Sequence, residues 1–196
     1  VEGPFAAAAH GITIVMLVAA IGNISGGHMN PAVTWAMIFR GAFKEDFDLF
    51  RGLGYILAQL AGAVAGVGML YGLALLTDGG KAAADAVNFG TPALADGLNP
   101  LGGVIYEAMF AFVLVFVILR TAVEEKLPWA PLAIGGAVFV GALTGNSFNP
   151  ARWFGPALIS GTWDNAWVYI LAPMIGAIIA VIINDLVSRD KNSSPA

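Results

Sequence analysis

A tripeptide that pairs a helix-capping side chain with a helix-starting proline occurs twice in the chain. The two copies are Asn30-Pro31-Ala32 and Asn149-Pro150-Ala151. Asparagine is a preferred helix N-cap, and proline suits the first helical position because its missing N–H would be unpaired there anyway. The asparagine carbonyl oxygen can cap the helix while its NH₂ group keeps two donors for a cavity. The pattern therefore predicts two helix starts, each offering neutral hydrogen-bond donors.

Each tripeptide is followed by an apolar stretch that is too short to cross a bilayer. Val33–Phe39 and Trp153–Ser160 give each motif about 10 apolar residues, half of the roughly 20 that a spanning helix needs. Irregular backbone at membrane depth survives only where it is buried in protein or lines a watery cavity. Gly26-Gly27 and Gly145 permit the bends before the motifs. We expect two half-helices whose N-termini, each carrying roughly +0.5 charge, meet in a wet passage that repels cations.

Composition points to a membrane protein. The chain has 196 residues, of which 58% are hydrophobic and 11% are charged, with no cysteine and a net charge of −4. A soluble domain carries about 25% charged residues, more than twice this share. The balance excludes an ordinary soluble enzyme, a nucleic-acid-binding protein, a disulfide-stapled scaffold and a disordered chain.

Long stretches with few charges predict five membrane spans. They lie near residues 5–24, 52–75, 102–122, 129–144 and 164–186. If the spans alternate, most basic residues fall on one side, which the positive-inside rule assigns to the cytoplasm. These residues are Arg40, Lys44, Arg51, Arg120, Lys126, Arg189 and Lys191. The N-terminus then lies outside, and because the first residue is not Met, we expect a further span upstream of it.

The chain contains an internal duplication. Tyr55-Ile56-Leu57-Ala58 recurs as Tyr169-Ile170-Leu171-Ala172, in the same order relative to the two Asn-Pro-Ala motifs. The first motif follows an out-to-in span and the second an in-to-out span, so the copies form an inverted repeat, which places a solute site near the bilayer midplane. The expected units are a first repeat lacking its first helix, an extracellular connecting loop, a second repeat and a polar cytoplasmic tail. Their boundaries are 1–76, 77–101, 102–188 and 189–196.

These motifs make the sequence similar to the aquaporin, or major intrinsic protein, family. The matching segments are Ile24–Val33, Asn149–Arg152 and Phe154–Ala157, and the similarity covers essentially the whole chain. The resemblance implies an all-α membrane fold, a right-handed bundle of six tilted helices with two re-entrant half-helices. It also implies a homotetramer with one pore in each protomer. This chain resembles that fold without its first helix.

The resemblance also implies roles for particular residues. A selectivity filter on the extracellular side would be formed by His10, Ala142, Asn146 and Arg152. An Arg at membrane depth costs about 2.5–3.5 kcal/mol on insertion scales and usually marks a conduction path. Two further residues resemble supports of the pore loops. Glu107 would accept backbone N–H bonds, and His28 would face the cytoplasmic vestibule, where a purely structural role is the alternative.

The function that these observations predict is a passive channel in the cell membrane that passes water and excludes ions and protons. Water-selective members usually have Phe and His where this chain has His10 and Ala142. Glycerol-conducting members usually carry Asp after the Arg and an aromatic residue three positions before the second Asn, where this chain has Trp153 and Asn146. A channel for ammonia, glycerol or another small neutral solute therefore stays open as an alternative, as does a structural membrane protein with a closed pore.

An enzyme is not expected. The ionisable residues at membrane depth are Glu107, His10 and Arg152, which form no acid–base pair and no metal-spaced cluster. We accordingly expect no catalytic residue, cofactor or metal. The expected partners are water, small uncharged solutes, the lipid bilayer and further copies of the chain, with no nucleic acid.

Overall fold

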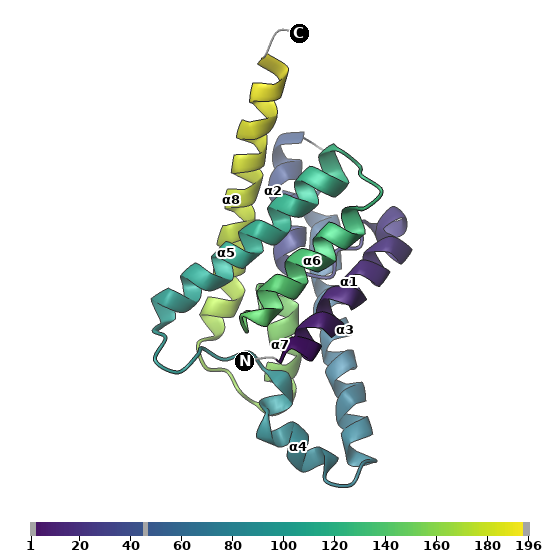
Figure 1. The fold of residues 1–196 in the computed structure, drawn as a ribbon, viewed down its shortest axis with the longest axis vertical. Helices are drawn as coiled ribbons and strands as arrows, with labels where there is room; N and C mark the ends of the chain where they lie inside the picture. Colours follow the sequence, from purple (N-terminus) through teal and green to yellow (C-terminus); the bar gives the residue numbers. More distant parts are fainter. Residues whose placement is uncertain (1–2, 45–46, 194–196) are drawn as a thin grey trace.

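The computed structural model describes residues 3–44 and 47–193, and its regular elements there are all helical. Four helices are long and apolar enough to cross a membrane (Figure 1). They are α1 (Pro4–Ser25), α3 (Leu49–Leu75), α5 (Pro100–Ile118) with its π-helical continuation η2 (Leu119–Glu124), and α8 (Ala166–Ser193). The shorter elements are α2 (Pro31–Lys44), α4 (Gly80–Ala86), η1 (Asn88–Gly90), α6 (Ala130–Leu143) and α7 (Pro150–Ser160).

The bounds of one expected span agree with the structure, while those of the expected loop and tail differ. The span expected at 129–144 is the short helix α6, whose 14 residues reach about 21 Å, less than the roughly 30 Å hydrocarbon core. The helix ends in a turn that leads to Gly145, whose φ of 78° lies in the left-handed region of backbone conformation. The expected loop at 77–101 contains α4 and η1, and α5 already begins at Pro100. The expected tail begins as helix, since α8 continues to Ser193, and residues 194–196 lie outside the described part.

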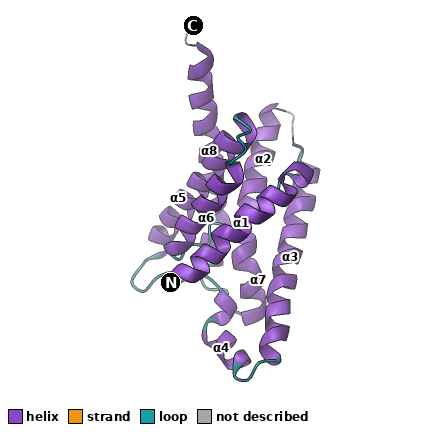
Figure 2. Cartoon of the chain, turned by 45° about the vertical axis from the view of Figure 1, so that its right-hand side comes forward, coloured by secondary structure: helices purple, strands orange, loops and turns teal. Residues whose placement is uncertain are grey.

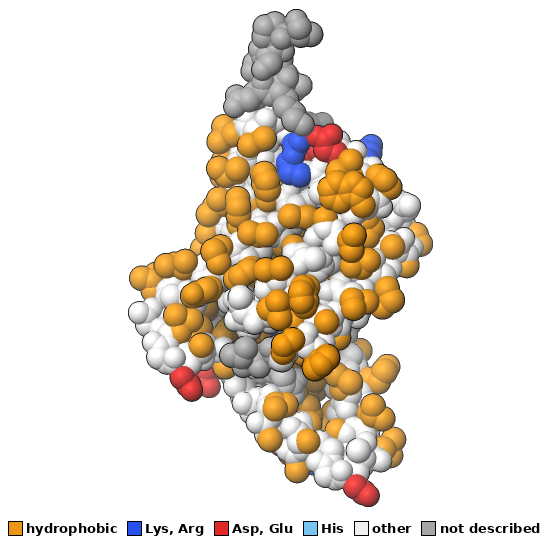
Figure 3. Space-filling model, in the orientation of Figure 1, with side chains coloured by type: hydrophobic (Ala, Val, Ile, Leu, Met, Phe, Trp, Pro, Cys, Tyr) orange, Lys and Arg blue, Asp and Glu red, His pale blue; other side chains and the backbone are white. Residues whose placement is uncertain are grey.

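The surface has the distribution of polarity that a bilayer requires. Large apolar side chains are exposed along all the long helices, including Met69 of α3 at 77% and Leu101 of α5 at 67%. In Figure 3 they cover the middle of the visible face, while the acidic and basic side chains on that face gather toward its two ends. The chain is therefore an integral membrane protein whose spanning helices present apolar groups to lipid.

α1 and α6 cross closely and lie side by side in Figures 1 and 2. A Cβ atom added at Gly11 would meet the Gly135 carbonyl oxygen at 2.8 Å, and one added at Gly135 would meet the Gly11 carbonyl oxygen at 2.5 Å. The contact is reciprocal, as expected for equivalent helices of an inverted repeat. Glycine is required at both positions because the two backbones touch.

This crossing gives a prediction with a control from the adjacent residue. Gly135→Ala should lower the free energy of unfolding by about 1–3 kcal/mol, because the added methyl group overlaps backbone that cannot move aside. A Cβ at Gly136 would meet nothing within 4 Å, so Gly136→Ala should leave stability unchanged or raise it through helix propensity. Thermal unfolding in detergent measures both, and equal midpoints for the two variants would contradict the tight crossing.

The two half-length helices pack on opposite sides of the bundle in equivalent ways. α2 lies against α8, where Ala36 and Ala177 are both fully buried in the same core cluster. α7 lies against α3, where a Cβ at Gly155 would come within 2.8 Å of the Ala63 backbone. Small residues at both contacts let the short helices approach the long ones closely, as is common where helices pack in lipid.

The far end of α2 is held by polar contacts. The Arg40 guanidinium lies 3.4 Å from a Glu124 carboxylate oxygen, which also accepts a hydrogen bond from the buried Asn184 amide at 3.4 Å. Glu124 is the last residue of the π-helical turn η2. These contacts tie the C-terminal part of α2 to η2, the continuation of α5, and tie η2 to α8.

Candidate functional site

A cavity of about 740 Å³ runs through the bundle between α1, α5, α6 and the starts of α2 and α7. At one end, which we call the Arg152 end, it is lined by His10, Ala142, Asn146 and Arg152. At the other, which we call the His28 end, its lining includes Gly27, His28 and Lys126. Asn30 and Asn149 line the same cavity, so the structure places both Asn-Pro-Ala motifs on one continuous space.

Each motif asparagine begins a half-length helix as its N-cap. The Asn30 side-chain oxygen accepts a hydrogen bond from the Ala32 backbone N–H at 2.8 Å. The Asn149 oxygen accepts from Ala151 N–H at 3.0 Å and from Arg152 N–H at 3.3 Å. Pro31 and Pro150 occupy the first helical positions, and both are buried with the alanines that follow them. The capping chemistry of the tripeptide accounts for both helix starts.

Each motif asparagine is hydrogen-bonded to the loop that precedes the other motif. The Asn30 amide nitrogen donates to the Phe148 carbonyl oxygen at 2.9 Å, and the Asn149 amide nitrogen donates to the Met29 carbonyl oxygen at 3.0 Å. We expected both N–H groups of each amide to face the cavity. In the structure, one N–H of each pair donates to a carbonyl oxygen of the opposite loop. Each amide keeps its second N–H for the cavity, and the crossed bonds hold the helix N-termini together.

A buried carboxylate supports the second loop. Glu107 of α5 is 1% exposed and accepts hydrogen bonds from the backbone N–H groups of Ser147, at 2.7 Å, and Phe148. Phe148 has a φ of 35°, a conformation that side chains other than glycine seldom adopt. Because Phe148 also supplies the carbonyl that Asn30 bonds, Glu107 indirectly sets the position of the Asn30 amide.

The four residues assigned to a filter lie together at the Arg152 end. The His10 Nδ1 lies 2.8 Å from the Ala6 carbonyl oxygen of its own helix, which requires the proton on Nδ1. The Asn146 amide donates to the Thr144 hydroxyl at 2.7 Å. Ala142 is 4% exposed and contributes only a methyl group. Their part in selectivity stays a prediction. Together they place one guanidinium, one imidazole and one amide on the wall of the cavity.

One polar group at this end was missed by reasoning from the sequence. The Arg152 Nη1 donates to the Gly90 carbonyl oxygen at 2.7 Å, across 62 residues of sequence. Gly90 belongs to the connecting loop, to which no chemistry was assigned. A backbone carbonyl leaves no trace in residue type, and no pattern around Gly90 could have indicated the contact.

His28 lies beside an aromatic cluster at the other end of the cavity. Its ring centroid is 5.5 Å from those of both Phe47 and Tyr55, and its carbonyl oxygen accepts a hydrogen bond from Gln59 at 2.7 Å. The Tyr55 hydroxyl donates to the Ser25 carbonyl oxygen at 3.0 Å. These contacts anchor the first loop to α3, much as Glu107 anchors the second loop to α5.

A second cavity, of about 690 Å³, opens along α3. It is lined by Ala58, Gln59 and Gly62 of α3, and it reaches Asn149 and Arg152 from the other side. The described residues therefore leave the motif region open toward α3. This opening and the first cavity meet at the same two polar side chains.

The charges around the motifs favour neutral or electron-rich groups. The N-termini of α2 and α7 meet at the crossed asparagines, and each carries roughly +0.5 charge from its helix dipole. The Arg152 guanidinium adds a full positive charge one turn away. Within residues 3–44 and 47–193, no three His, Cys, Asp or Glu side chains gather as metal ligands would. The site therefore offers hydrogen-bond donors in surroundings of positive electrostatic potential.

Known proteins are similar to this chain in sequence and in fold. Residues 3–184 match the family model of the major intrinsic proteins. The probable aquaporin TIP1-2 of Oryza sativa subsp. japonica is 38% identical over 191 residues, which are 93% of this chain and 70% of that protein. Aquaporin-4 of Rattus norvegicus is 37% identical over 178 residues, which are 87% of this chain and 52% of that protein. The solved structure of the aquaglyceroporin from Plasmodium falciparum has the same fold, with a TM-score of 0.79 at 22% identity, covering 96% of this chain and 84% of that one.

Proposed function

The chain belongs to the major intrinsic protein family, and we propose that it is a passive channel that conducts water and excludes ions and protons. The observation that carries the proposal is the crossed pair of asparagines on one cavity, Asn30 bonded to the Phe148 carbonyl and Asn149 to the Met29 carbonyl. The pairing fixes two amide donors at the meeting point of two helix N-termini. No bond is made or broken in this function, and no cofactor is required.

Water passes this point by accepting hydrogen bonds from the two asparagines. Each amide has one N–H committed to the opposite loop and a second N–H for the cavity. A water molecule whose oxygen lone pairs are both engaged by Asn30 and Asn149 cannot accept a proton from its neighbour, which interrupts proton hopping. The positive helix ends and Arg152 repel cations at the same place.

Selectivity is assigned to His10, Ala142, Asn146 and Arg152, which line the Arg152 end. The small Ala142 side chain and the polar Asn146 favour passage of small neutral solutes such as ammonia or glycerol as the second candidate function. A closed-pore structural protein is disfavoured, because the cavity has about 740 Å³ of space and no large apolar side chain stands among these four residues.

Stopped-flow light scattering of liposomes that contain the purified protein tests the proposal. Water permeability well above that of empty liposomes, with proton permeability equal to empty liposomes, supports a water channel. Glycerol or ammonia flux above the empty-liposome level, without added water flux, selects the second candidate. Water and solute fluxes that all equal those of empty liposomes would overturn both.

We also propose that one more transmembrane helix packs on α3, where the second cavity opens. α3 and α8 are equivalent in the repeat, yet none of the most apolar stretch of α3 is buried, against 44% of that in α8. α8 is covered by α5, where a Cβ at Gly176 would overlap the Ala108 backbone, whereas the equivalent Gly62 has nothing within 4 Å. Asn149 and Arg152 would otherwise face acyl chains, at a high cost in free energy.

This packing makes Gly62 sensitive to substitution in the membrane. We expect Gly62→Leu to lower stability by about 1–3 kcal/mol, as overpacked contacts do. Gly72, near the end of the same helix, also has open space around it and should accept leucine. Thermal stability measured in membranes of cells that express each variant compares them. Equal stability of the two variants would contradict a helix at this face.

The membrane and the assembly state are further parts of the proposal. We place the protein in the cell membrane as a homotetramer with one passage per protomer. Gly54 and Gly66 of α3 also have open space around them, so small residues continue along this helix and allow close contact between neighbouring helices in lipid.

A further inference from the structure

The asparagine at the Arg152 end uses its amide in the opposite sense from the two motif asparagines. The side-chain oxygens of Asn30 and Asn149 cap helices, which leaves their NH₂ groups as donors. Asn146 instead directs its NH₂ group at the Thr144 hydroxyl, 2.7 Å away. Its side-chain oxygen takes part in none of the hydrogen bonds within the described part of the chain. Asn146 therefore offers an acceptor at the Arg152 end.

The orientation of the Asn146 amide follows from the Thr144 hydroxyl. That hydroxyl donates its one proton to the Gly141 carbonyl oxygen at 2.7 Å, because a carbonyl cannot donate. The Thr144 oxygen can then only accept from Asn146, so the group that faces it must be NH₂ and not C=O. Gly141 lies in the last turn of α6, and Thr144 is the C-cap of that helix. The end of α6 thus orients the amide.

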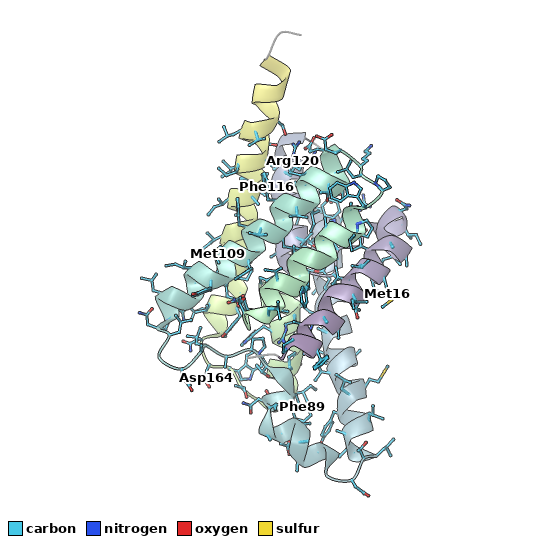
Figure 4. The ribbon with its side chains drawn as sticks, viewed as in Figure 1. Met16, Phe89, Met109, Phe116, Arg120 and Asp164 are labelled. Atoms are coloured by element: carbon cyan, nitrogen blue, oxygen red, sulfur yellow. The ribbon has the colours of Figure 1, made fainter. Side chains whose placement is uncertain are left out.

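A solute at the Arg152 end meets this acceptor together with a donor. Asn146 and Arg152 line the same end of the cavity, and Ala142 beside them adds only a methyl group. A guanidinium carries five N–H donors and no acceptor, whereas an amide oxygen only accepts. This end faces the lower part of the molecule in Figure 4, where Phe89 and Asp164 are labelled.

We propose that Asn146, oriented by Thr144, makes the Arg152 end selective for small primary amides, of which formamide is the smallest. The proposal rests on the proposed function and names a class of solute for the same passage. The carbonyl oxygen of a primary amide accepts a hydrogen bond from Arg152, and its NH₂ group donates to the Asn146 oxygen. A polar group that leaves water and finds no partner costs free energy, so a site with both partners admits such a solute more readily than a site with donors alone.

The test compares formamide and water permeability per protein in liposomes. Formamide flux through the unaltered chain should exceed that of empty liposomes. Asn146→Leu keeps a similar shape but has no acceptor, and it should lower the formamide-to-water permeability ratio roughly tenfold, the scale of one hydrogen bond. Thr144→Val removes the hydroxyl that orients the amide, so Asn146 can turn its NH₂ group to the cavity, and the ratio should fall roughly threefold. This second variant reports on the acceptor even if Asn146→Leu folds poorly.

Asn23→Leu is the matched control, because it makes the same change on the same cavity. Asn23 lies about 20 Å further along α1 than His10, toward the His28 end. In Figure 4, Met16 marks the middle of α1 between these two residues. The formamide-to-water ratio should be unchanged in this variant, and a fall equal to that in Asn146→Leu would overturn the assignment to Asn146.

The remaining outcomes separate this inference from the water channel. A ratio that is unchanged in both Asn146→Leu and Thr144→Val, whether the two fluxes are kept or fall together, would overturn the amide selectivity. So would formamide flux of the unaltered chain equal to that of empty liposomes while water flux exceeds it, and the water channel would stand. Formamide flux without added water flux would overturn the water channel and support the amide passage, and the absence of both fluxes would overturn both.

Discussion

Glu107→Ala should lower the free energy of unfolding by about 2–6 kcal/mol and abolish conduction. The substitution leaves the backbone N–H groups of Ser147 and Phe148 buried without their acceptor, and each such group costs about 1–3 kcal/mol. Against a typical total stability of about 5–15 kcal/mol, this is the largest single-residue effect that we expect. Thermal unfolding in detergent gives the stability, and liposome swelling gives the conduction.

Two variants test whether the carboxylate itself is responsible. Tyr106→Ala removes a larger side chain from the adjacent position, which is 44% exposed, and should change the unfolding midpoint little. Glu107→Gln keeps one acceptor oxygen and turns an NH₂ group toward the second backbone N–H, so its loss should be intermediate. If Glu107→Ala were as stable as Tyr106→Ala, Glu107 would not support the second loop.

Arg152→Val should raise the ratio of glycerol to water permeability about tenfold, which corresponds to roughly 1.4 kcal/mol of barrier. The guanidinium occupies space at the Arg152 end and provides the only full charge among the four residues assigned to the filter. Valine is the residue found at the equivalent position of the first repeat, Val33, so the half-helix tolerates it. Parallel swelling assays with water and glycerol gradients measure the ratio.

A change at the lipid-facing side of the same helix serves as the control. Leu158 is 46% exposed and lies in α7 with Arg152, so Leu158→Ala should leave the glycerol-to-water ratio unchanged. Proton flux should also rise in Arg152→Val, because a positive barrier has been removed. A ratio equal to that of the unaltered chain would remove Arg152 from the filter.

The helix starts and the inverted repeat could be read from the sequence. Asn-Pro-Ala fixes a helix start by local capping chemistry, and the short apolar stretches limit the length of each helix, so α2 and α7 begin where the motifs predict. Local rules of this kind act within a few residues and need no knowledge of the rest of the fold. The expectation that Glu107 accepts backbone N–H bonds came from the family resemblance, and the bonds from Ser147 and Phe148 agree with it.

The contacts that join distant segments could not be predicted in the same way. The crossed bonds from Asn30 and Asn149 end on carbonyls of Phe148 and Met29, and the Arg152 contact ends on the carbonyl of Gly90. Every residue has a carbonyl, so residue type says nothing about which one is used.

The most direct test of the account asks whether solute passes through the cavity beside the motifs. The chain has no cysteine, so a single cysteine at Ala142, which lines the cavity, can be labelled selectively. The account predicts that a thiol-reactive mercurial reduces water flux through Ala142→Cys to the level of empty liposomes, and that a reducing thiol restores it, while labelled Leu158→Cys conducts normally. Full flux through completely labelled Ala142→Cys would show that water takes another route and would contradict the account.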